Sequence, residues 1–267
     1  MDFIIFYLQV LLLPIAVFVI CGLAVALCNT AFNRLAGRSG RVLIYATSII
    51  GTPVHEAGHA VMCLLFFHKI TSMSLWQPKN SNGVLGYVEH SYNKKNPYMV
   101  LGNLFIGLGP IFSGLCIILA VIGICFPVAL NDYMESSMTI LGNGDGLFHV
   151  FIECMKLIPS AIKEESMPIW VKIIGIFIML SVSLHINLSP SDISGSLRSM
   201  PIYMLIVLAF SGIIYFTGAD NVFRVLFDLK KFALYTSIIY MIVIICAIML
   251  VGIALIFFIF RKIFRRQ

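Results

Sequence analysis

Long apolar stretches alternate with short polar segments along the chain. A helix needs roughly 20 apolar residues to cross the hydrocarbon core of a bilayer, which is about 30 Å thick. Six stretches come close to or exceed this length: Phe3 to Cys28, Val42 to Phe67, Tyr98 to Leu130, Ile169 to Leu188, Met200 to Thr217 and Phe232 to Phe260. The pattern predicts an all-α polytopic membrane protein with about six transmembrane helices, folded as a single domain over residues 1–267.

The polar segment after the second stretch has a different pattern. Turn-forming residues between Pro78 and Gly83 separate two short apolar runs, Met73 to Trp76 and Val84 to Val88. Apolar runs on both sides of such a cluster predict a small β-hairpin. A solvated loop is the alternative interpretation of this segment.

The composition excludes several classes of protein. Hydrophobic residues make up 60% of the chain and charged residues only 11%, whereas a soluble domain has about 25% charged residues. A soluble enzyme, a disordered chain and a nucleic-acid-binding protein are therefore excluded. The seven cysteines lie mostly in apolar runs without a CxxC pair, so we expect buried free thiols rather than disulfides or thiolate metal ligands.

The basic residues bear on the orientation in the membrane. Cytoplasmic loops of membrane proteins carry an excess of Lys and Arg. For six spans, the Lys and Arg residues divide evenly between the two sides. The dense cluster from Arg261 to Arg266, compared with the acidic segment 131–168, favours both termini on the cytoplasmic side, with the cell membrane as the expected location.

The second stretch contains the residues that carry chemistry, in the sequence Gly51-Thr-Pro-Val-His-Glu-Ala-Gly-His-Ala60. His55 and His59 are four residues apart and so share one face of a helix. Two imidazoles at this spacing can bind zinc, and Glu56 can then reach a metal-bound water. Ionisable groups at the bilayer centre cost about 2.5–3.5 kcal/mol each, which favours a functional role. The alternative is three polar groups hydrogen-bonded to neighbouring helices, without catalysis.

A third protein ligand has to come from another segment. The fourth stretch ends near His185, Asn187 and Asp192. Asp192 is the preferred ligand because a carboxylate completes a His₂-carboxylate set, and His185 is the alternative. Ser189-Pro190-Ser191-Asp192 also predicts the start of a helix, with Ser189 as the N-cap. The two interpretations are compatible, since a capped helix would hold the carboxylate rigidly.

The sequence from His55 to His59, with the distal Asp192, resembles the site-2 protease family of intramembrane zinc metalloproteases, the M50 class. The segments from Gly83 to Val88 and from Gly107 to Ser113 resemble the membrane-associated hairpin and the Gly-Pro element of that family. The similarity covers roughly residues 42–200, the expected catalytic core, and it describes a compact, divergent member. The resemblance implies that His55, His59 and Asp192 bind Zn²⁺ and that Glu56 is the catalytic base.

The predicted function is therefore that of an intramembrane zinc metalloendopeptidase. It would cleave transmembrane or juxtamembrane segments of membrane proteins, so its expected partners are a membrane-protein or peptide substrate and the lipid bilayer, with no nucleic acid. Leu85 and Val88 are expected to pair with an unwound substrate by β-augmentation. Asn103 is expected either to bond the substrate backbone or to contact another helix.

Two other functions fit the same residues. One is a non-catalytic membrane protein with a retained metal site, acting as a transporter or as a regulator that binds transmembrane segments. The other is a zinc hydrolase that acts on a small or lipid amide. His68 and His90 lie at or beyond the membrane ends, and we expect them to be ordinary loop residues.

Overall fold

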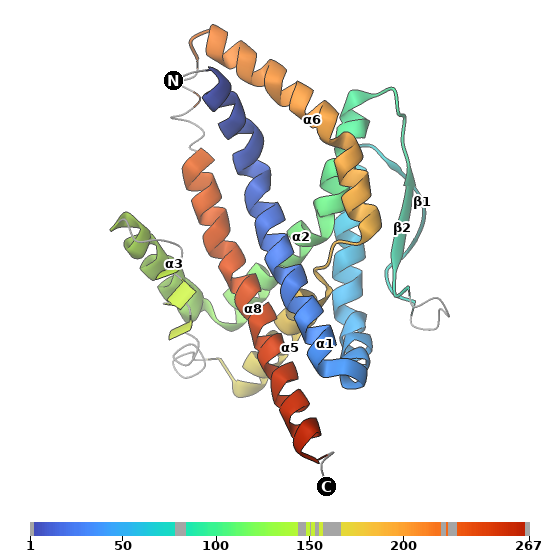
Figure 1. Ribbon diagram of the computed structural model, residues 1–267, viewed down its shortest axis with the longest axis vertical. Coiled ribbons are helices and arrows are strands. Elements are labelled where there is room, and N and C mark those ends of the chain that lie inside the picture. Colours follow the sequence, from blue (N-terminus) through green and yellow to red (C-terminus); the bar gives the residue numbers. More distant parts are fainter. Residues whose placement is uncertain are drawn as a thin grey trace.

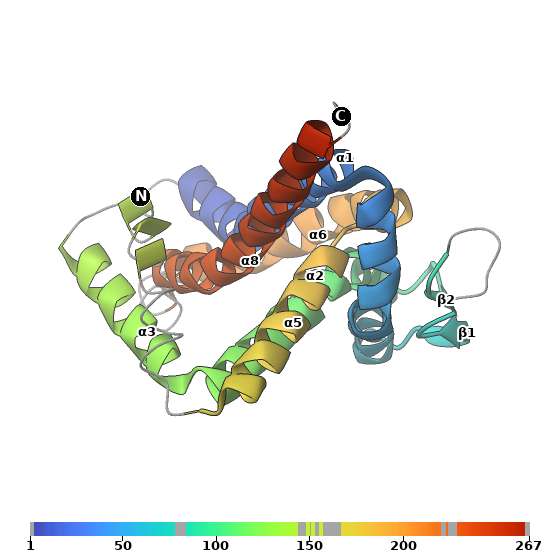
Figure 2. The ribbon, with the colours of Figure 1, turned by 90° about the horizontal axis from the view of Figure 1, so that it is seen from below.

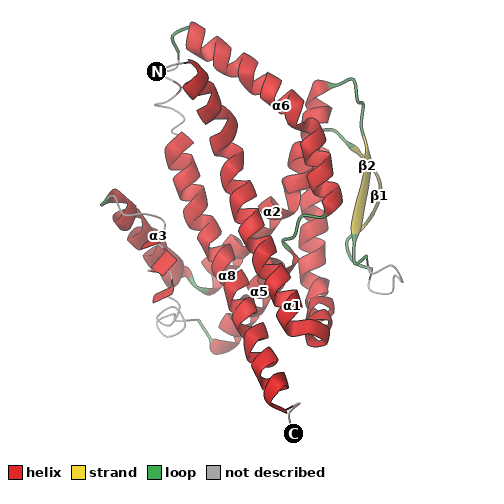
Figure 3. Ribbon diagram, in the orientation of Figure 1, coloured by secondary structure: helices red, strands yellow, loops and turns green. Residues whose placement is uncertain are grey.

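The computed structural model describes residues 3–77, 84–143, 148–149, 151–152, 155–156, 167–219, 223 and 229–264. The helices and strands of these residues are α1 (Phe3–Leu65), β1 (Lys69–Ser74), β2 (Tyr87–Ser91), α2 (Pro97–Cys125), α3 (Pro127–Gly142), α5 (Ile169–His185), α6 (Pro190–Phe216) and α8 (Leu229–Phe264). The protein is mostly helical, with one antiparallel hairpin on the outside of the bundle (Figures 1 and 3). The predicted helical class and the hairpin are confirmed.

Within the described residues, four helical stretches are long and apolar enough to cross a membrane: Phe3–Gly37, Pro97–Cys125, Pro190–Phe216 and Lys231–Ile263. They correspond to the first, third, fifth and sixth predicted spans. The second predicted span is the C-terminal half of α1, which carries the polar residues of the predicted metal site, and the fourth is the 17-residue helix α5. The four long helices indicate a multi-pass integral membrane protein.

A sharp turn at Gly37 divides α1 into two halves (Figure 1). Gly37 has φ 57° and ψ −125°, a left-handed conformation that glycine adopts without steric cost. A Cβ at this position would lie 2.9 Å from Nη1 of Arg261, so the end of α8 passes directly over the turn. The segment between the first two predicted spans is therefore a tight turn between helices rather than a loop.

The two termini lie at opposite ends of the molecule (Figure 1). The first half of α1 and α8 run in the same direction, because the Phe18 ring lies 5.6 Å from the Tyr240 ring and Gly37 lies against Arg261. This parallel course differs from the regular alternation of six spans on which the prediction of both termini on one side was based. The difference arises at the junction of α5 and α6, where the chain continues along the molecule instead of reversing (Figure 1).

The hairpin follows α1 directly and lies beside the C-terminal half of that helix (Figures 1 and 2). Met73 is paired with Val88 in the antiparallel register. Leu85 precedes β2, and its carbonyl accepts a hydrogen bond of 2.7 Å from the Gln77 N–H. The predicted turn, at 78–83, lies outside the described residues.

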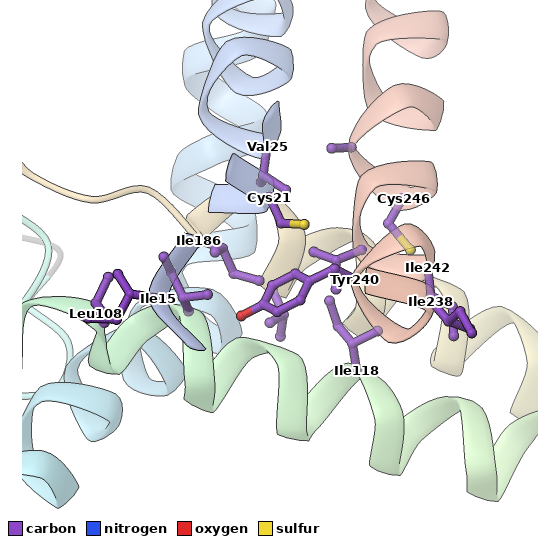
Figure 4. Close-up of a cluster of buried hydrophobic side chains, with 14 of the residues drawn as sticks. Ile15, Cys21, Val25, Leu108, Ile118, Ile186, Ile238, Tyr240, Ile242 and Cys246 are labelled. Atoms are coloured by element: carbon purple, nitrogen blue, oxygen red, sulfur yellow. The ribbon is translucent and has the colours of Figure 1, made fainter. Parts of the chain in front are cut away.

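The main hydrophobic core lies where α1, α2 and α8 meet. The Tyr240 ring of α8 is fully buried there among Cys21, Ile118 and Ile186 (Figure 4). Six of the seven cysteines fall in the described residues and are free, as predicted; Cys116 is exposed, while four others are buried. Cys154 lies outside the described residues. The packing of this core holds α1 against α2.

Candidate metal centre

Three side chains from two distant segments meet inside the helical bundle. His55 and His59 come from the second half of α1, and Asp192 comes from the first turn of α6. Their ligand atoms all lie within 4.8 Å of one another, an arrangement that could hold a metal ion. Nε2 of His59 is 3.3 Å from Nε2 of His55 and 3.5 Å from Oδ1 of Asp192. The structure thus brings together the three residues that the sequence predicted as a group.

Two backbone carbonyls orient the imidazole rings. Nδ1 of His59 lies 2.7 Å from the Ile106 carbonyl oxygen of α2, and Nδ1 of His55 lies 2.9 Å from the His185 carbonyl oxygen of α5. Because a carbonyl can only accept, each Nδ1 carries the proton, and in the neutral rings each Nε2 keeps a free lone pair. Metal-ligating histidines in proteins are commonly held in this way.

Both carbonyls are available because a helix is interrupted nearby. In a regular helix the Ile106 carbonyl would accept from the N–H of residue 110, but Pro110 has no N–H. The His185 carbonyl belongs to the last turn of α5, where carbonyls lack helical partners. It also accepts a hydrogen bond of 2.9 Å from the Asn187 N–H. A proline and a helix end therefore provide the acceptors that fix the two imidazoles.

The start of α6 holds the carboxylate of Asp192. Oδ2 of Asp192 accepts hydrogen bonds from the Ser189 N–H at 2.8 Å and from the Ser189 hydroxyl at 2.6 Å. The Ser189 hydroxyl in turn accepts from the Asp192 N–H, which completes a capping box. The predicted N-cap is confirmed. Since the cap uses Oδ2, the other oxygen of the carboxylate is the one that faces His59.

Glycines allow the three helices to approach closely at this site. A Cβ at Gly58 would lie 2.5 Å from the Gly109 carbonyl oxygen of α2, and a Cβ at Gly109 would lie 2.6 Å from the Gly58 carbonyl oxygen. A Cβ at Gly107 would lie 2.6 Å from the Asp192 carbonyl oxygen. The Ser113 hydroxyl donates to the Val54 carbonyl at 2.8 Å. The segment 107–113 of α2 thus packs against both α1 and α6.

Glu56 is buried, with 7% of its surface exposed. It lies in α1 between the two histidines, and the chain just before β2 packs against it. A Cβ at Gly86 would lie 2.8 Å from Cγ of Glu56 and 2.7 Å from Cγ2 of Thr52. On the same side of α1, Nε1 of Trp76 donates to the Ser48 hydroxyl at 2.9 Å. The chain on the turn side of the hairpin therefore covers the face of α1 that carries Glu56.

The remaining predicted site residues have other contacts. The His185 ring packs against Gly51, and its Nδ1 lies 2.8 Å from the Ser181 carbonyl oxygen. His185 therefore contacts His55 through its backbone carbonyl, and its ring is not a member of the candidate metal centre. The Asn103 amide donates to the Val100 carbonyl of its own helix at 3.1 Å. Leu85 and Val88 belong to the hairpin, and Val88 pairs with Met73; their substrate contacts stay predictions.

Two of the three donor–donor distances are close to those of neighbouring ligands on one metal ion. Ligands at about 2.0–2.2 Å from a metal in a tetrahedron lie about 3.3 Å apart. Nε2 of His59 is 3.3 Å from Nε2 of His55 and 3.5 Å from Oδ1 of Asp192, and all three ligand atoms lie within 4.8 Å of one another. Two imidazole lone pairs and a carboxylate oxygen would repel one another at this distance without a shared cation.

A second pair of histidines, not predicted from the sequence, lies at the base of the hairpin. His68 is buried, and its Nδ1 lies 2.9 Å from Nδ1 of His90. Nε2 of His68 donates to the Met99 carbonyl at 2.7 Å, so neutral His68 accepts at Nδ1 and His90 donates. Burial lowers the pKa of both rings below the usual value of 6.5. These two residues join α1, β2 and α2, which corrects their prediction as ordinary loop residues.

No family model, curated protein or solved structure matches the chain. The positions of His55, His59 and Asp192 are therefore the observation on which a function for the chain rests.

Proposed function

We propose that the protein is an intramembrane zinc metalloendopeptidase of the site-2 protease kind. The single observation that carries this proposal is the meeting of His55, His59 and Asp192, whose ligand atoms all lie within 4.8 Å of one another. The sequence adds Glu56 next to the first histidine, the position of the general base in zinc hydrolases with the HExxH pattern. The helices around the site are those of a membrane protein, so the substrate would be a membrane-embedded or juxtamembrane peptide segment.

The chain's own groups have distinct tasks in this reaction. A zinc ion held by His55, His59 and Asp192 supplies Lewis acidity toward the scissile carbonyl and makes water easier to deprotonate. Glu56 takes the proton from the attacking water and delivers it to the leaving amide nitrogen. Its burial beside Gly86 would limit the access of bulk water to the carboxylate. General acid–base catalysis of this type contributes about 10²–10⁴-fold to a rate.

The substrate has to unwind before it can be cut. In a transmembrane helix the carbonyls are already bonded to N–H groups four residues later. The hairpin beside Glu56 offers strand edges that could pair with an unwound segment by β-augmentation. Leu85 and Val88 are the residues proposed to border that segment, and Asn103 is a further candidate on α2.

The test compares two Glu→Gln substitutions in purified protein reconstituted into liposomes. The probes are single-span test proteins whose transmembrane helices contain an Asn-Gly pair, which weakens the helix. Glu56→Gln should keep about one zinc per chain and reduce cleavage at least about 100-fold. Glu89→Gln is the matched control, because Glu89 is an exposed carboxylate of β2; it should keep both zinc and cleavage.

Three outcomes would overturn the proposal. A wild-type protein that binds no zinc would remove the metal centre. Cleavage by Glu56→Gln at the wild-type rate would remove the assigned base. Zinc binding by the wild type without cleavage of any probe would favour the non-catalytic, metal-binding alternative.

A further inference from the structure

A fully buried asparagine lies in the first half of α1, outside the segment that carries the metal-site motif. Asn29 belongs to the candidate span Phe3–Gly37. A buried amide in a membrane-spanning helix costs free energy unless it is hydrogen-bonded. Its burial in a largely apolar helix therefore needs a physical reason.

Asn29 bonds to the end of α5. Its Nδ2 donates to the carbonyls of Ser183 at 3.0 Å and of Leu184 at 3.3 Å. In a continuing helix the Ser183 carbonyl would accept from the N–H of Asn187, but that N–H bonds to the His185 carbonyl instead. The side chain of Asn29 thus supplies donors to carbonyls that the helix end leaves without one.

The bonded carbonyls directly precede the one that orients a metal-site histidine. His185 follows Leu184, and its carbonyl accepts from Nδ1 of His55 at 2.9 Å. The end of α5 is also held from the other side, where the Ser183 hydroxyl lies 3.5 Å from the Val243 carbonyl oxygen of α8. Any shift of the last turn of α5 would therefore move the acceptor that holds the His55 ring.

Packing alone does not account for the amide. Oδ1 of Asn29 is buried and has no hydrogen-bond partner, and an unsatisfied buried acceptor costs about 1–3 kcal/mol. A leucine of similar size would fill the same space without this cost. The feature that leucine lacks is the pair of N–H donors directed at Ser183 and Leu184.

We propose that Asn29 is a positioning residue for the metal centre: by fixing the last turn of α5, it sets the His185 carbonyl that selects the tautomer and the direction of His55. The inference rests on the proposed metal site. It extends that site to the first half of α1, outside residues 42–200.

The test uses Asn29→Leu with Tyr133→Phe as the control. Tyr133→Phe also removes a buried side-chain bond to a backbone carbonyl, of 2.6 Å to Ile238, but it joins α3 to α8, neither of which carries a ligand. Binding of Co²⁺ is followed by its visible absorption and by competition with a chelator. In the metal-free proteins, the ¹⁵N shifts of the histidine side chains report the tautomer of His55. Asn29→Val, which also lacks the donors and is smaller than leucine, is measured as a second variant in case the leucine variant does not fold.

Second-sphere changes around metal-ligating histidines typically weaken binding 10–100-fold, and Asn29 acts through one further contact. We therefore expect Asn29→Leu and Asn29→Val to weaken Co²⁺ binding about tenfold and to mix the His55 tautomers, while Tyr133→Phe lowers thermal stability only. Wild-type affinity together with a wild-type tautomer in the Asn29 variants would overturn the inference. Absence of Co²⁺ binding in the wild type would instead overturn the proposed function, and the tautomer measurement would still decide the role of Asn29.

Discussion

Gly58→Ala places one methyl group at the closest contact of the metal centre. Gly58 lies between Glu56 and His59 in α1, where the backbones of α1 and α2 touch. The new Cβ would lie 2.5 Å from both the Gly109 carbonyl oxygen and the Ser113 hydroxyl oxygen. Ordinary contact begins at 3.4 Å. The difference of about 0.9 Å cannot be absorbed by a flexible side chain alone, because the nearest atom is backbone.

This displacement is large for a metal site. Separation of the helices by about 0.9 Å would lengthen the bond from Nδ1 of His59 to the Ile106 carbonyl from 2.7 Å to about 3.6 Å, beyond hydrogen-bond length. Asp192 would move with α2 as well, because α6 packs on Gly107. Metal sites tolerate about ±0.2 Å in ligand distances. We expect zinc affinity to fall about 10–100-fold, together with a loss of about 1–3 kcal/mol in stability from overpacking.

The measurement is a competition titration of zinc against a chromophoric chelator, with thermal unfolding recorded on the same samples. Gly195→Ala is the control, since Gly195 lies three residues after Asp192 and a Cβ there would meet no atom within 4 Å. It should bind zinc like the wild type. If Gly58→Ala also bound zinc with the wild-type Kd, the close approach of the two backbones would not determine the geometry of the site.

Three further predictions follow from the fold. Gly86→Ala places a methyl group against Glu56 and against none of the three proposed metal ligands, so cleavage should fall while zinc content stays at the wild-type level. Loss of zinc in this variant would contradict the assignment of Glu56 as a base that does not bind the metal. Because burial lowers the pKa of His68 and of His90, the native state binds fewer protons than the unfolded chain, so stability should be highest above about pH 6.5 and fall as the pH decreases below it. Thermal unfolding between pH 5 and 8 checks this, and His90→Gln should show a shallower dependence. Reporter fusions at the two ends of the chain should lie on opposite sides of the membrane, whereas reporters on the same side would contradict the parallel course of the first half of α1 and α8.

The three residues of the candidate metal centre could be predicted from the sequence because their chemistry is rare at membrane depth. The spacing of His55 and His59 places both on one helical face, and few carboxylates other than Asp192 lie near the end of an apolar stretch. The Ser189 cap was also predictable, because Ser and Pro at the start of a helix have defined roles. These signals depend on the identity of side chains.

The groups that orient the ligands could not be predicted in the same way. Every residue has a carbonyl, so nothing in the identity of Ile106 or His185 marks it as an acceptor for a metal-site histidine. Pro110 is the one signal for Ile106, since it removes the donor four residues later. The direction in which each helix runs through the bundle could not be predicted either, because hydropathy gives the length of an apolar stretch and not its direction. The continuation from α5 into α6 could not be predicted for this reason.

The capping box at the start of α6 has a consequence for spectroscopy. The Ser189 amide proton is bonded to one oxygen of the Asp192 carboxylate, and the other oxygen of that carboxylate faces His59. Any cation that draws charge from the Asp192 carboxylate weakens Oδ2 as an acceptor and so weakens its hydrogen bond with the Ser189 N–H. The amide resonance of Ser189 is thus a built-in reporter of metal occupancy, at a backbone position that requires no label on the ligands themselves.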